Sequence, residues 1–284
     1  MLSRSISISL LVLYGLFLHV VFAVPVETVY EALGPLSTTN SYQPRDTAIV
    51  PPLWRGEAGR TPEEVRKDGG FVSRGLQVLQ GKNKSYRTLT VQQKIQSVSL
   101  FMHATGSAAT LSMTQYISTT IEPKIAHDFV MLRKPSIGGY IYKLYPGARA
   151  INLNATLPAN KNPSPHEQEY SVPGIIPWAM VEGWYQLSPA KGIYRAKGPT
   201  ESPLRYNPFA GAVFHKNPSF NPRYRNQRLG SGLPTLAGAD ITEKGAVSPS
   251  GLQLIKNFES FVTRVAVGGG ATELNRYRGF GAQR

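Results

Sequence analysis

The sequence predicts an α+β fold, with helices early in the main domain and strands later. Two helix starts are marked by capping boxes, Thr61 to Glu64 and Thr90 to Gln93, in which the two side chains accept each other's backbone N–H groups. Three later segments, 114–120, 138–147 and 178–187, are rich in β-branched and aromatic residues, which favour strands. Helices followed by strands are typical of α+β domains, whereas α/β domains alternate βαβ units.

End signals and apolar spacing place the individual elements. A short strand is expected to end at Leu53 and Trp54, and the first helix to begin at Pro62 and stop at Gly69-Gly70. A second helix is expected over 90–104 and a third over 120–130. Their predicted apolar stripes are Val91, Ile95 and Val98 in the second helix, and Ile121, Ile125 and Phe129 in the third.

The chain divides by composition into four parts. Residues 1–23 have Arg4 before a long apolar run that ends at Ala23, so we expect a cleaved signal peptide and a secreted protein; a membrane anchor is the alternative. A polar leader arm is expected over 24–50, the main domain over 51–225, and a linker with a helical tail over 226–284. The tail helix at 250–267 has an apolar stripe of Leu252, Ile255, Phe258 and Val262, and Gly268–Gly270 should end it.

The composition excludes several classes of function. The 284 residues include no cysteine, so disulfides, thiol catalysis and cysteine-ligated metals are excluded. The five histidines lack the spacing of metal ligands, and we expect no metal. A formal net charge of +14 favours acidic partners, or serves solubility alone. No nucleic-acid-binding motif accompanies this charge, so we expect no nucleic-acid partner.

Two carboxylates, Glu167 and Glu169, lie two residues apart in the stretch NPSPHEQEYS. On a strand, residues i and i+2 point to the same face about 6–7 Å apart, so both would enter one cleft while Gln168 faces away. Such a pair is often only an exposed acidic loop. A glycosidase fits poorly, because its two carboxylates face each other across the sugar bond and usually come from separate elements.

Cleavage of the N-glycosidic bond of NAD suits this pair better. Positive charge develops on the ribose as nicotinamide leaves, and a nearby carboxylate stabilises that charge. A second carboxylate can orient an arginine acceptor and help to remove its proton. The chemistry also needs an arginine for the pyrophosphate and a small hydroxyl to hold the first carboxylate.

Four ordered blocks resemble the enzymatic subunits of the cholera toxin and heat-labile enterotoxin family, which are mono-ADP-ribosyltransferases. The blocks are LWRGEAGRTPEEVRKDGGFVSRGLQ, SLFMHATG, YISTT and SPHEQEYSVPGIIPWAMVEGWYQL, and they cover roughly residues 51–190. The resemblance implies the ADP-ribosyltransferase fold. Two small, mostly antiparallel sheets would surround an NAD cleft, with flanking helices and a C-terminal helical tail.

The resemblance also implies a role for each matching residue. Glu169 is expected to be the catalytic carboxylate at the NAD ribose, Glu167 to serve the arginine acceptor, and Ser118 to brace the cleft and orient Glu169. Arg55 is expected to bind the phosphate and ribose region of NAD and to hydrogen-bond the Ser-Thr strand.

Further residues of the same blocks are expected around the NAD. Thr119 belongs to the Ser-Thr motif, and His103 would support the site, although it could equally be a packing histidine. Glu57 stands where the family has Asp, and one extra residue precedes Arg60, so the loop expected to cover NAD is altered. The absence of cysteine is another departure, because the family joins its enzymatic and tail fragments by a disulfide around a nicked loop.

The sequence therefore predicts a secreted enzyme that transfers ADP-ribose from NAD, as substrate, to an arginine of a host protein, such as a G-protein α subunit. The tail could attach to a separate cell-binding subunit, as the tail of the family does. Two alternatives remain open: an NAD glycohydrolase, in which water takes the ribose, and a non-enzymatic secreted binding protein on the same fold.

Overall fold

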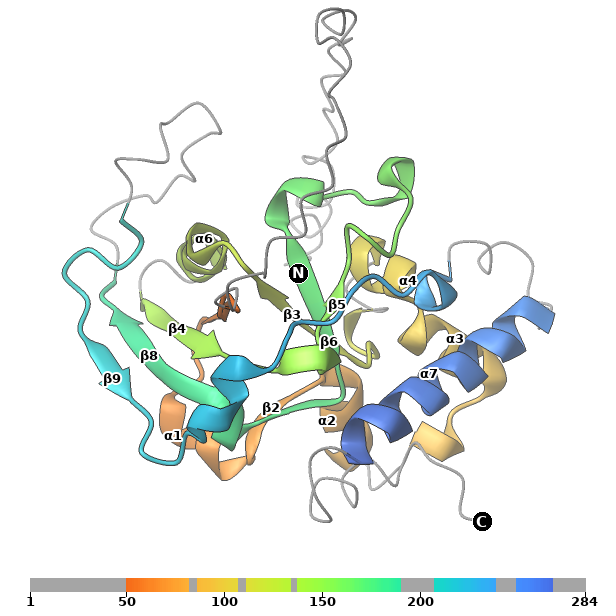
Figure 1. Cartoon of the computed structure of the whole chain (residues 1–284), viewed down its shortest axis with the longest axis horizontal. Helices are drawn as coiled ribbons and strands as arrows, with labels where there is room; N and C mark the ends of the chain where they lie inside the picture. Colours follow the sequence, from red (N-terminus) through yellow and green to blue (C-terminus); the bar gives the residue numbers. More distant parts are fainter. Residues whose placement is uncertain are drawn as a thin grey trace, which may run out of the picture. The chain divides into compact units, whose positions relative to one another are not determined.

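An antiparallel sheet of seven strands runs through the middle of the described chain, in the order β5-β6-β3-β1-β4-β8-β9 (Figure 1). The computed structural model describes residues 50–81, 86–106, 111–133, 137–189, 207–238 and 249–267. The predicted signal peptide, nearly all of the leader arm and the predicted stop at 268–270 lie outside these residues. The seven strands are β1 (Leu53–Glu57), β3 (Tyr116–Thr120), β4 (Gly139–Leu144), β5 (Ile151–Asn152), β6 (Glu169–Pro173), β8 (Val181–Leu187) and β9 (Phe214–Lys216).

A second sheet has two strands, β2 (Gly70–Val72) and β7 (Ile175–Pro177). The combination of helices with antiparallel sheets confirms the predicted α+β class, with the strands divided unequally between the two sheets. The expected strand at Leu53 and Trp54 is present, but these residues begin β1 and do not end it. The strand predicted at 178–187 starts later, because Trp178–Met180 form a 3-10 turn.

The helices are α1 (Pro62–Lys67), α2 (Arg74–Gly81), α3 (Val91–Val98), α4 (Leu100–Thr105), α6 (Pro123–Arg133) and α7 (Pro249–Val267). Both predicted capping boxes are confirmed, at Thr61 and at Thr90. The single helix expected over 90–104 is wrong. Ser99 adopts an extended conformation (φ −77°, ψ 121°) and ends α3, while its side chain caps α4 by accepting from the backbone N–H of Met102 at 3.2 Å.

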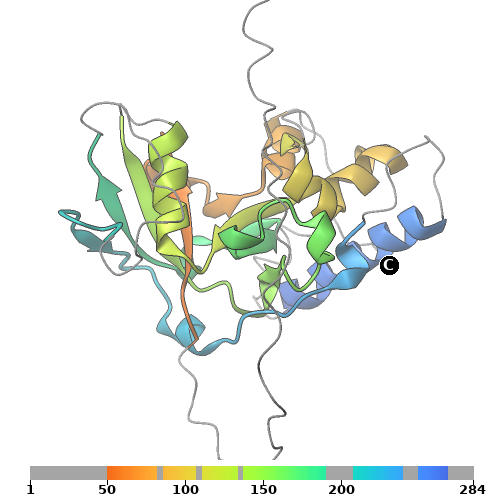
Figure 2. The ribbon, with the colours of Figure 1, turned by 90° about the horizontal axis from the view of Figure 1, so that it is seen from above.

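Helix α6 covers the middle of the large sheet, over β1 and β4 (Figures 1 and 2). A Cβ on Gly56 would lie 2.1 Å from the carbonyl oxygen of Ala126, so glycine permits this close approach. Ala126 and Val130 face the sheet, and the stripe predicted for this helix is therefore wrong. Ile121 precedes the helix, and Phe129 is 38% exposed because it faces the cleft described below.

Helices α2, α3, α4 and α7 gather at the end of the large sheet formed by β5 and β6 (Figures 1 and 2). Helix α7 packs against α3, and its apolar side joins the core cluster of that end. Leu252 of the predicted stripe is 44% exposed, whereas Leu254 is buried beside the correctly predicted Ile255, Phe258 and Val262. The described residues all belong to one unit, 47–284. The domain boundary after residue 225 stays a prediction.

The remaining short elements are 3-10 turns between the helices and strands. They are η1 (Tyr86–Thr88), η2 (Gly147–Arg149), η3 (Ala159–Lys161), η4 (Pro165–Glu167), η5 (Trp178–Met180), η7 (Pro222–Asn226) and η8 (Pro234–Leu236). Over the described part of the chain, none of the helices combines the length and the hydropathy needed to cross a membrane.

Candidate active site

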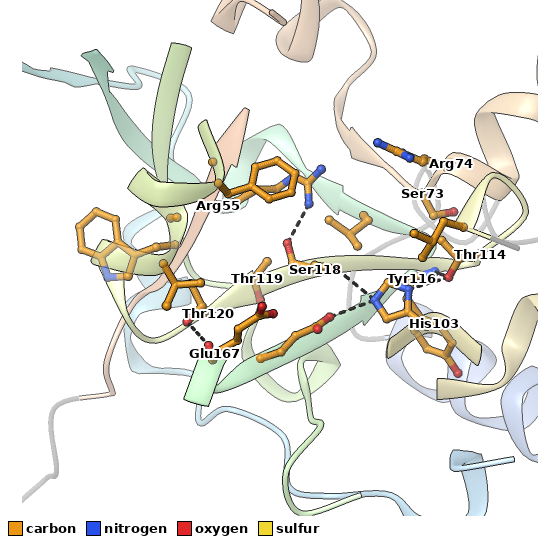
Figure 3. A pocket seen from close by; sticks show the side chains of 18 of the residues that line it. Arg55, Ser73, Arg74, His103, Thr114, Tyr116, Ser118, Thr119, Thr120 and Glu167 are labelled. Atoms are coloured by element: carbon orange, nitrogen blue, oxygen red, sulfur yellow. Dashed lines mark hydrogen bonds and ion pairs between the residues drawn. The ribbon is translucent and has the colours of Figure 1, made fainter. Parts of the chain in front are cut away.

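A cleft opens where β1, β3 and β6 meet helices α4 and α6 (Figure 3). Six of the residues singled out in the sequence line it: Arg55, His103, Ser118, Thr119, Glu167 and Glu169. Trp54, Ser73, Arg74, Ile125, Phe129 and Arg133 also contribute to its walls. The three strands are neighbours in the sheet, so residues more than a hundred positions apart in the chain meet in one place.

Arg55 is fixed at the point where β1 and β3 diverge. These two strands pair through one residue pair, Trp54 opposite Thr120. Beyond it, Nη1 of Arg55 donates to the backbone carbonyl of Ser118 at 2.7 Å, as predicted (Figure 3). Nε of Arg55 donates to the Glu57 carboxylate at 2.8 Å. The guanidinium is thus held from two sides while it lines the cleft.

Glu169 is the first residue of β6, and its carboxylate is surrounded by donors. Oε1 accepts from Nε2 of His103 at 2.9 Å and from the hydroxyl of Ser171 at 2.8 Å. Burial of the carboxyl raises its pKa. The charge and hydrogen bond of His103, with hydrogen bonds of Ser171 and Ser118, outweigh burial and hold the pKa of Glu169 below its ordinary value. Glu169 is therefore ionised at neutral pH.

His103 lies on α4 and is 7% exposed. Its Nδ1 lies 2.8 Å from Oγ1 of Thr114, and its Nε2 lies 3.1 Å from Oγ of Ser118 (Figure 3). A histidine held at both ring nitrogens keeps a fixed orientation. The buried ring of His103 thus packs in the interior and also contacts Glu169. The supporting role at NAD stays a prediction.

Glu167 reaches the cleft by a different route from the one predicted. The expectation that Glu167 and Glu169 alternate on one strand is wrong, because Glu167 ends the 3-10 turn η4 and precedes β6. Gln168 between them is left-handed, with φ 44° and ψ 48°, and this conformation turns the chain so that both carboxylates line the cleft. The hydroxyl of Thr120 donates to the carbonyl of Glu167 at 2.6 Å and fixes the turn.

The pKa of Glu167 moves in the opposite direction from that of Glu169. Burial raises the pKa of Glu167 first, and the nearby negative charge of Glu169 raises it further. The two carboxylates of the cleft therefore differ in how readily they take up a proton. Such a difference separates the roles of paired carboxylates in acid–base chemistry.

Two of the predicted NAD-binding residues do not line the cleft. Glu57 is 9% exposed and pairs with Arg55, so it acts on the cleft only through that arginine. Arg60 forms an ion pair with Asp68 at 2.7 Å. Thr119 lines the cleft, but its hydroxyl donates to the backbone carbonyl of Tyr170 at 2.6 Å.

Sequence reasoning missed Ser171 and Thr114. Ser171 follows Glu169 by two positions on β6 and lies opposite Ser118 on β3, so alternation along the strand could have identified it. Thr114 lies before β3 and carries no local signal for contact with His103. Within the ranges that the structure describes, no group of three His, Asp or Glu side chains is arranged to hold a metal ion.

The chain belongs to the family described as heat-labile enterotoxin alpha chain, whose model matches residues 50–240, more than half of its length. Three curated relatives illustrate the similarity. The A chain of heat-labile enterotoxin IIB from Escherichia coli is 36% identical over 135 residues, which are 45% of this chain and 46% of the relative. The NAD(+)–arginine ADP-ribosyltransferase Chelt from Vibrio cholerae is 33% identical over 45% of this chain and 20% of its own length.

The third relative is the A chain of cholera enterotoxin from Vibrio cholerae, which is 30% identical over 48% of this chain and 49% of its own length. The matched region therefore spans about half or less of these relatives. Among solved structures, a mutant of E. coli heat-labile enterotoxin is 23% identical, with a TM-score of 0.45, over 71% of this chain and 96% of that chain.

Proposed function

We propose that this chain is an NAD-dependent ADP-ribosyltransferase that transfers ADP-ribose to an arginine side chain and releases nicotinamide. The observation that carries the proposal is the ionised Glu169, held by His103 and Ser171 in a cleft that Arg55 also lines. Family membership and the name of one relative, an NAD(+)–arginine ADP-ribosyltransferase, support the same chemistry.

In the proposed reaction the bond between C1′ of the ribose and the nicotinamide nitrogen breaks, and the electron pair leaves with nicotinamide. The ribose becomes an oxocarbenium-like cation, which the Glu169 carboxylate stabilises. Because its hydrogen bonds to His103 and Ser171 are already formed, the carboxylate needs little reorganisation when the positive charge develops.

Arg55 would hold the negatively charged pyrophosphate of NAD at the other side of the cleft. Its Nε and Nη2 donate to Glu57 and its Nη1 donates to Ser118, which fixes the guanidinium but still leaves one N–H on each Nη for a phosphate oxygen. The cleft has a volume of about 190 Å3. This is below the 300–1,000 Å3 usual for small-molecule pockets, so only part of NAD would be enclosed.

Glu167 would act on the acceptor. A nitrogen of the arginine guanidinium forms the new bond to C1′, and one proton must leave that nitrogen. Burial and the charge of Glu169 raise the pKa of Glu167, and such a carboxylate is a better proton acceptor than an ordinary one. The half-buried position of Glu167 at the cleft leaves it accessible to a side chain of another protein.

The biological setting belongs to the proposal as well. We infer a secreted protein that acts on an arginine of a host protein, and the candidate target is the α subunit of a G protein. We further propose that a separate cell-binding subunit attaches through the helical tail. Helix α7 already packs its apolar side against α3, so such a subunit would contact its exposed side, where Leu252 lies.

Incubation with NAD labelled in its adenylate half, with and without agmatine as an arginine analogue, tests the proposal. We expect nicotinamide release together with label on agmatine. Free ADP-ribose without labelled agmatine would assign the chain as an NAD glycohydrolase, and no turnover at all would assign it as a binding protein. Glu169→Gln should abolish the signal, while Glu63→Gln, an exposed glutamate on α1, should not change it.

A further inference from the structure

A second cavity, of about 600 Å3, lies between α7, the turn η2 and the segment 224–233. None of its lining residues lines the cleft that holds Glu169. One wall is α7, which lies beyond the residues 50–240 that match the family model. Helix α7 also contacts η8, the turn that follows this segment. The cavity is therefore a feature separate from the catalytic machinery.

Three arginines from three separate segments line this cavity. Arg149 comes from η2, Arg228 from the segment after η7, and Arg264 from α7. Among the described residues that line the cavity, none is Asp or Glu. An anion in a space lined by several guanidinium groups and by no carboxylate is attracted by each of those groups.

The remaining walls are suited to the organic part of a ligand. Tyr224, Phe261, Ile151, Met180, Leu233 and Val265 supply aromatic and aliphatic surface. Gln227 and Ser231 add polar groups that can fix orientation. A mostly apolar cavity of 300–1,000 Å3 with a few convergent polar groups is typical of small-molecule sites.

The backbone around the cavity is closely packed. A Cβ on Gly230 would lie 2.2 Å from the carbonyl oxygen of Ala150, so the segment approaches η2 as closely as glycine permits. The backbone N–H of Asn152 donates to the carbonyl of Ser231 at 3.3 Å and joins the segment to β5. Arg149 itself is 5% exposed. The cavity is thus formed by fixed backbone at its base, with Arg228 and Arg264 exposed at its opening.

We propose that this cavity binds a phosphate-bearing organic molecule of nucleotide size, with Arg149, Arg228 and Arg264 around the phosphates. Guanidinium groups bind phosphate oxygens in a bidentate manner, and three of them match a polyphosphate better than a single carboxylate. A bound polyphosphate would bridge α7 to η2 and to the segment at 224–233. Binding therefore joins the C-terminal helix more firmly to the rest of the unit.

Isothermal titration of the full chain with ATP at about 150 mM salt tests this proposal, with pyrophosphate and adenosine as the comparison ligands. We expect ATP to bind more tightly than pyrophosphate, because the base would contact the apolar walls, and adenosine to bind weakest. Arg228→Gln and Arg264→Gln should each weaken ATP binding about tenfold, the size of one lost charge-assisted contact. Both positions are exposed, so these variants should fold.

Two controls separate the second cavity from the catalytic cleft and from non-specific charge. Arg66→Gln, an exposed arginine on α1, should leave ATP binding unchanged. Arg55→Lys should leave ATP binding unchanged while it impairs NAD cleavage, and the two cavity variants should keep the rate of NAD cleavage. An equal loss in Arg66→Gln, or a loss of ATP binding in Arg55→Lys alone, would overturn the proposal. So would pyrophosphate or adenosine binding as tightly as ATP.

Discussion

Ser171→Ala is the substitution that most directly tests how the protein keeps Glu169 ionised. The Ser171 hydroxyl is completely buried and donates to Oε1 of Glu169 at 2.8 Å. Alanine removes one oxygen atom and leaves the backbone pairing with Ser118 intact. The change therefore removes one hydrogen bond from the carboxylate and otherwise preserves the cleft.

The magnitude follows from the strength of that hydrogen bond. A hydrogen bond to a charged group contributes about 1.5–3 kcal/mol, which corresponds to a factor of roughly ten to a hundred in an ionisation equilibrium. Because the bond stabilises the ionised form, its loss raises the pKa of Glu169. The hydrogen-bond partners that remain, above all His103, should keep the change in the ionisation equilibrium of Glu169 near the lower end, a factor of roughly ten.

The assay is the rate of nicotinamide release without an acceptor, measured across the acidic pH range. In Ser171→Ala the acidic limb of the profile should move to higher pH, while the rate on the neutral plateau falls only modestly. Ser97→Ala is the matched control, because this serine is also buried but its hydroxyl donates to the backbone carbonyl of Lys94 within α3. An acidic limb that stays in place in Ser171→Ala would refute the claim that hydrogen bonding sets the ionisation of Glu169.

Three further substitutions follow from the structure. Glu169→Gln should lower both NAD cleavage and transfer by about two orders of magnitude. Glu167→Gln should abolish transfer to agmatine and leave appreciable NAD cleavage. Equal losses of cleavage and transfer in Glu167→Gln would contradict the division of roles. Glu167→Gln should also raise the melting temperature at pH 7 but not at pH 3. The pKa of Glu167 is raised in the folded protein, so this carboxyl stabilises the fold while it is protonated and loses that contribution as the pH rises. Glutamine removes the unfavourable charge at pH 7, whereas at pH 3 there is no charge to remove. Calorimetry at the two pH values checks the sign. Gly56→Ala should cost about 1–3 kcal/mol of unfolding free energy, because its Cβ would meet the carbonyl oxygen of Ala126 and displace α6; an unchanged urea midpoint would contradict that contact.

Local signals in the sequence predicted the helix starts better than the faces of the helices. The capping boxes at Thr61 and Thr90 were correct because the bonds they describe lie within four residues. The stripe predicted for 120–130 was wrong because the side of α6 that packs on β1 is set by Gly56, about seventy residues away. Likewise Phe129 is apolar and in register, yet it serves the cleft and not the core.

The site itself was recognisable from its residue types, but its geometry was not. Arg55, Ser118 and Glu169 were singled out because they occur in ordered blocks, and the structure brings them to neighbouring strands. The turn before β6 could not be predicted, since a left-handed Gln168 is uncommon for a residue other than glycine. Strand periodicity therefore placed Glu167 on the wrong element, although it correctly predicted that both carboxylates share one cleft.

The left-handed residue also explains how two neighbouring carboxylates come to have opposite pKa shifts. The turn at Gln168 leaves Glu169 at the start of β6, beside His103 and Ser171, and moves Glu167 away from those donors but not from the charge of Glu169. Glu169 is thereby kept ionised, while burial and then the charge of Glu169 raise the pKa of Glu167. A single backbone conformation thus supplies both the stabilising anion and the proton acceptor that the proposed transfer requires.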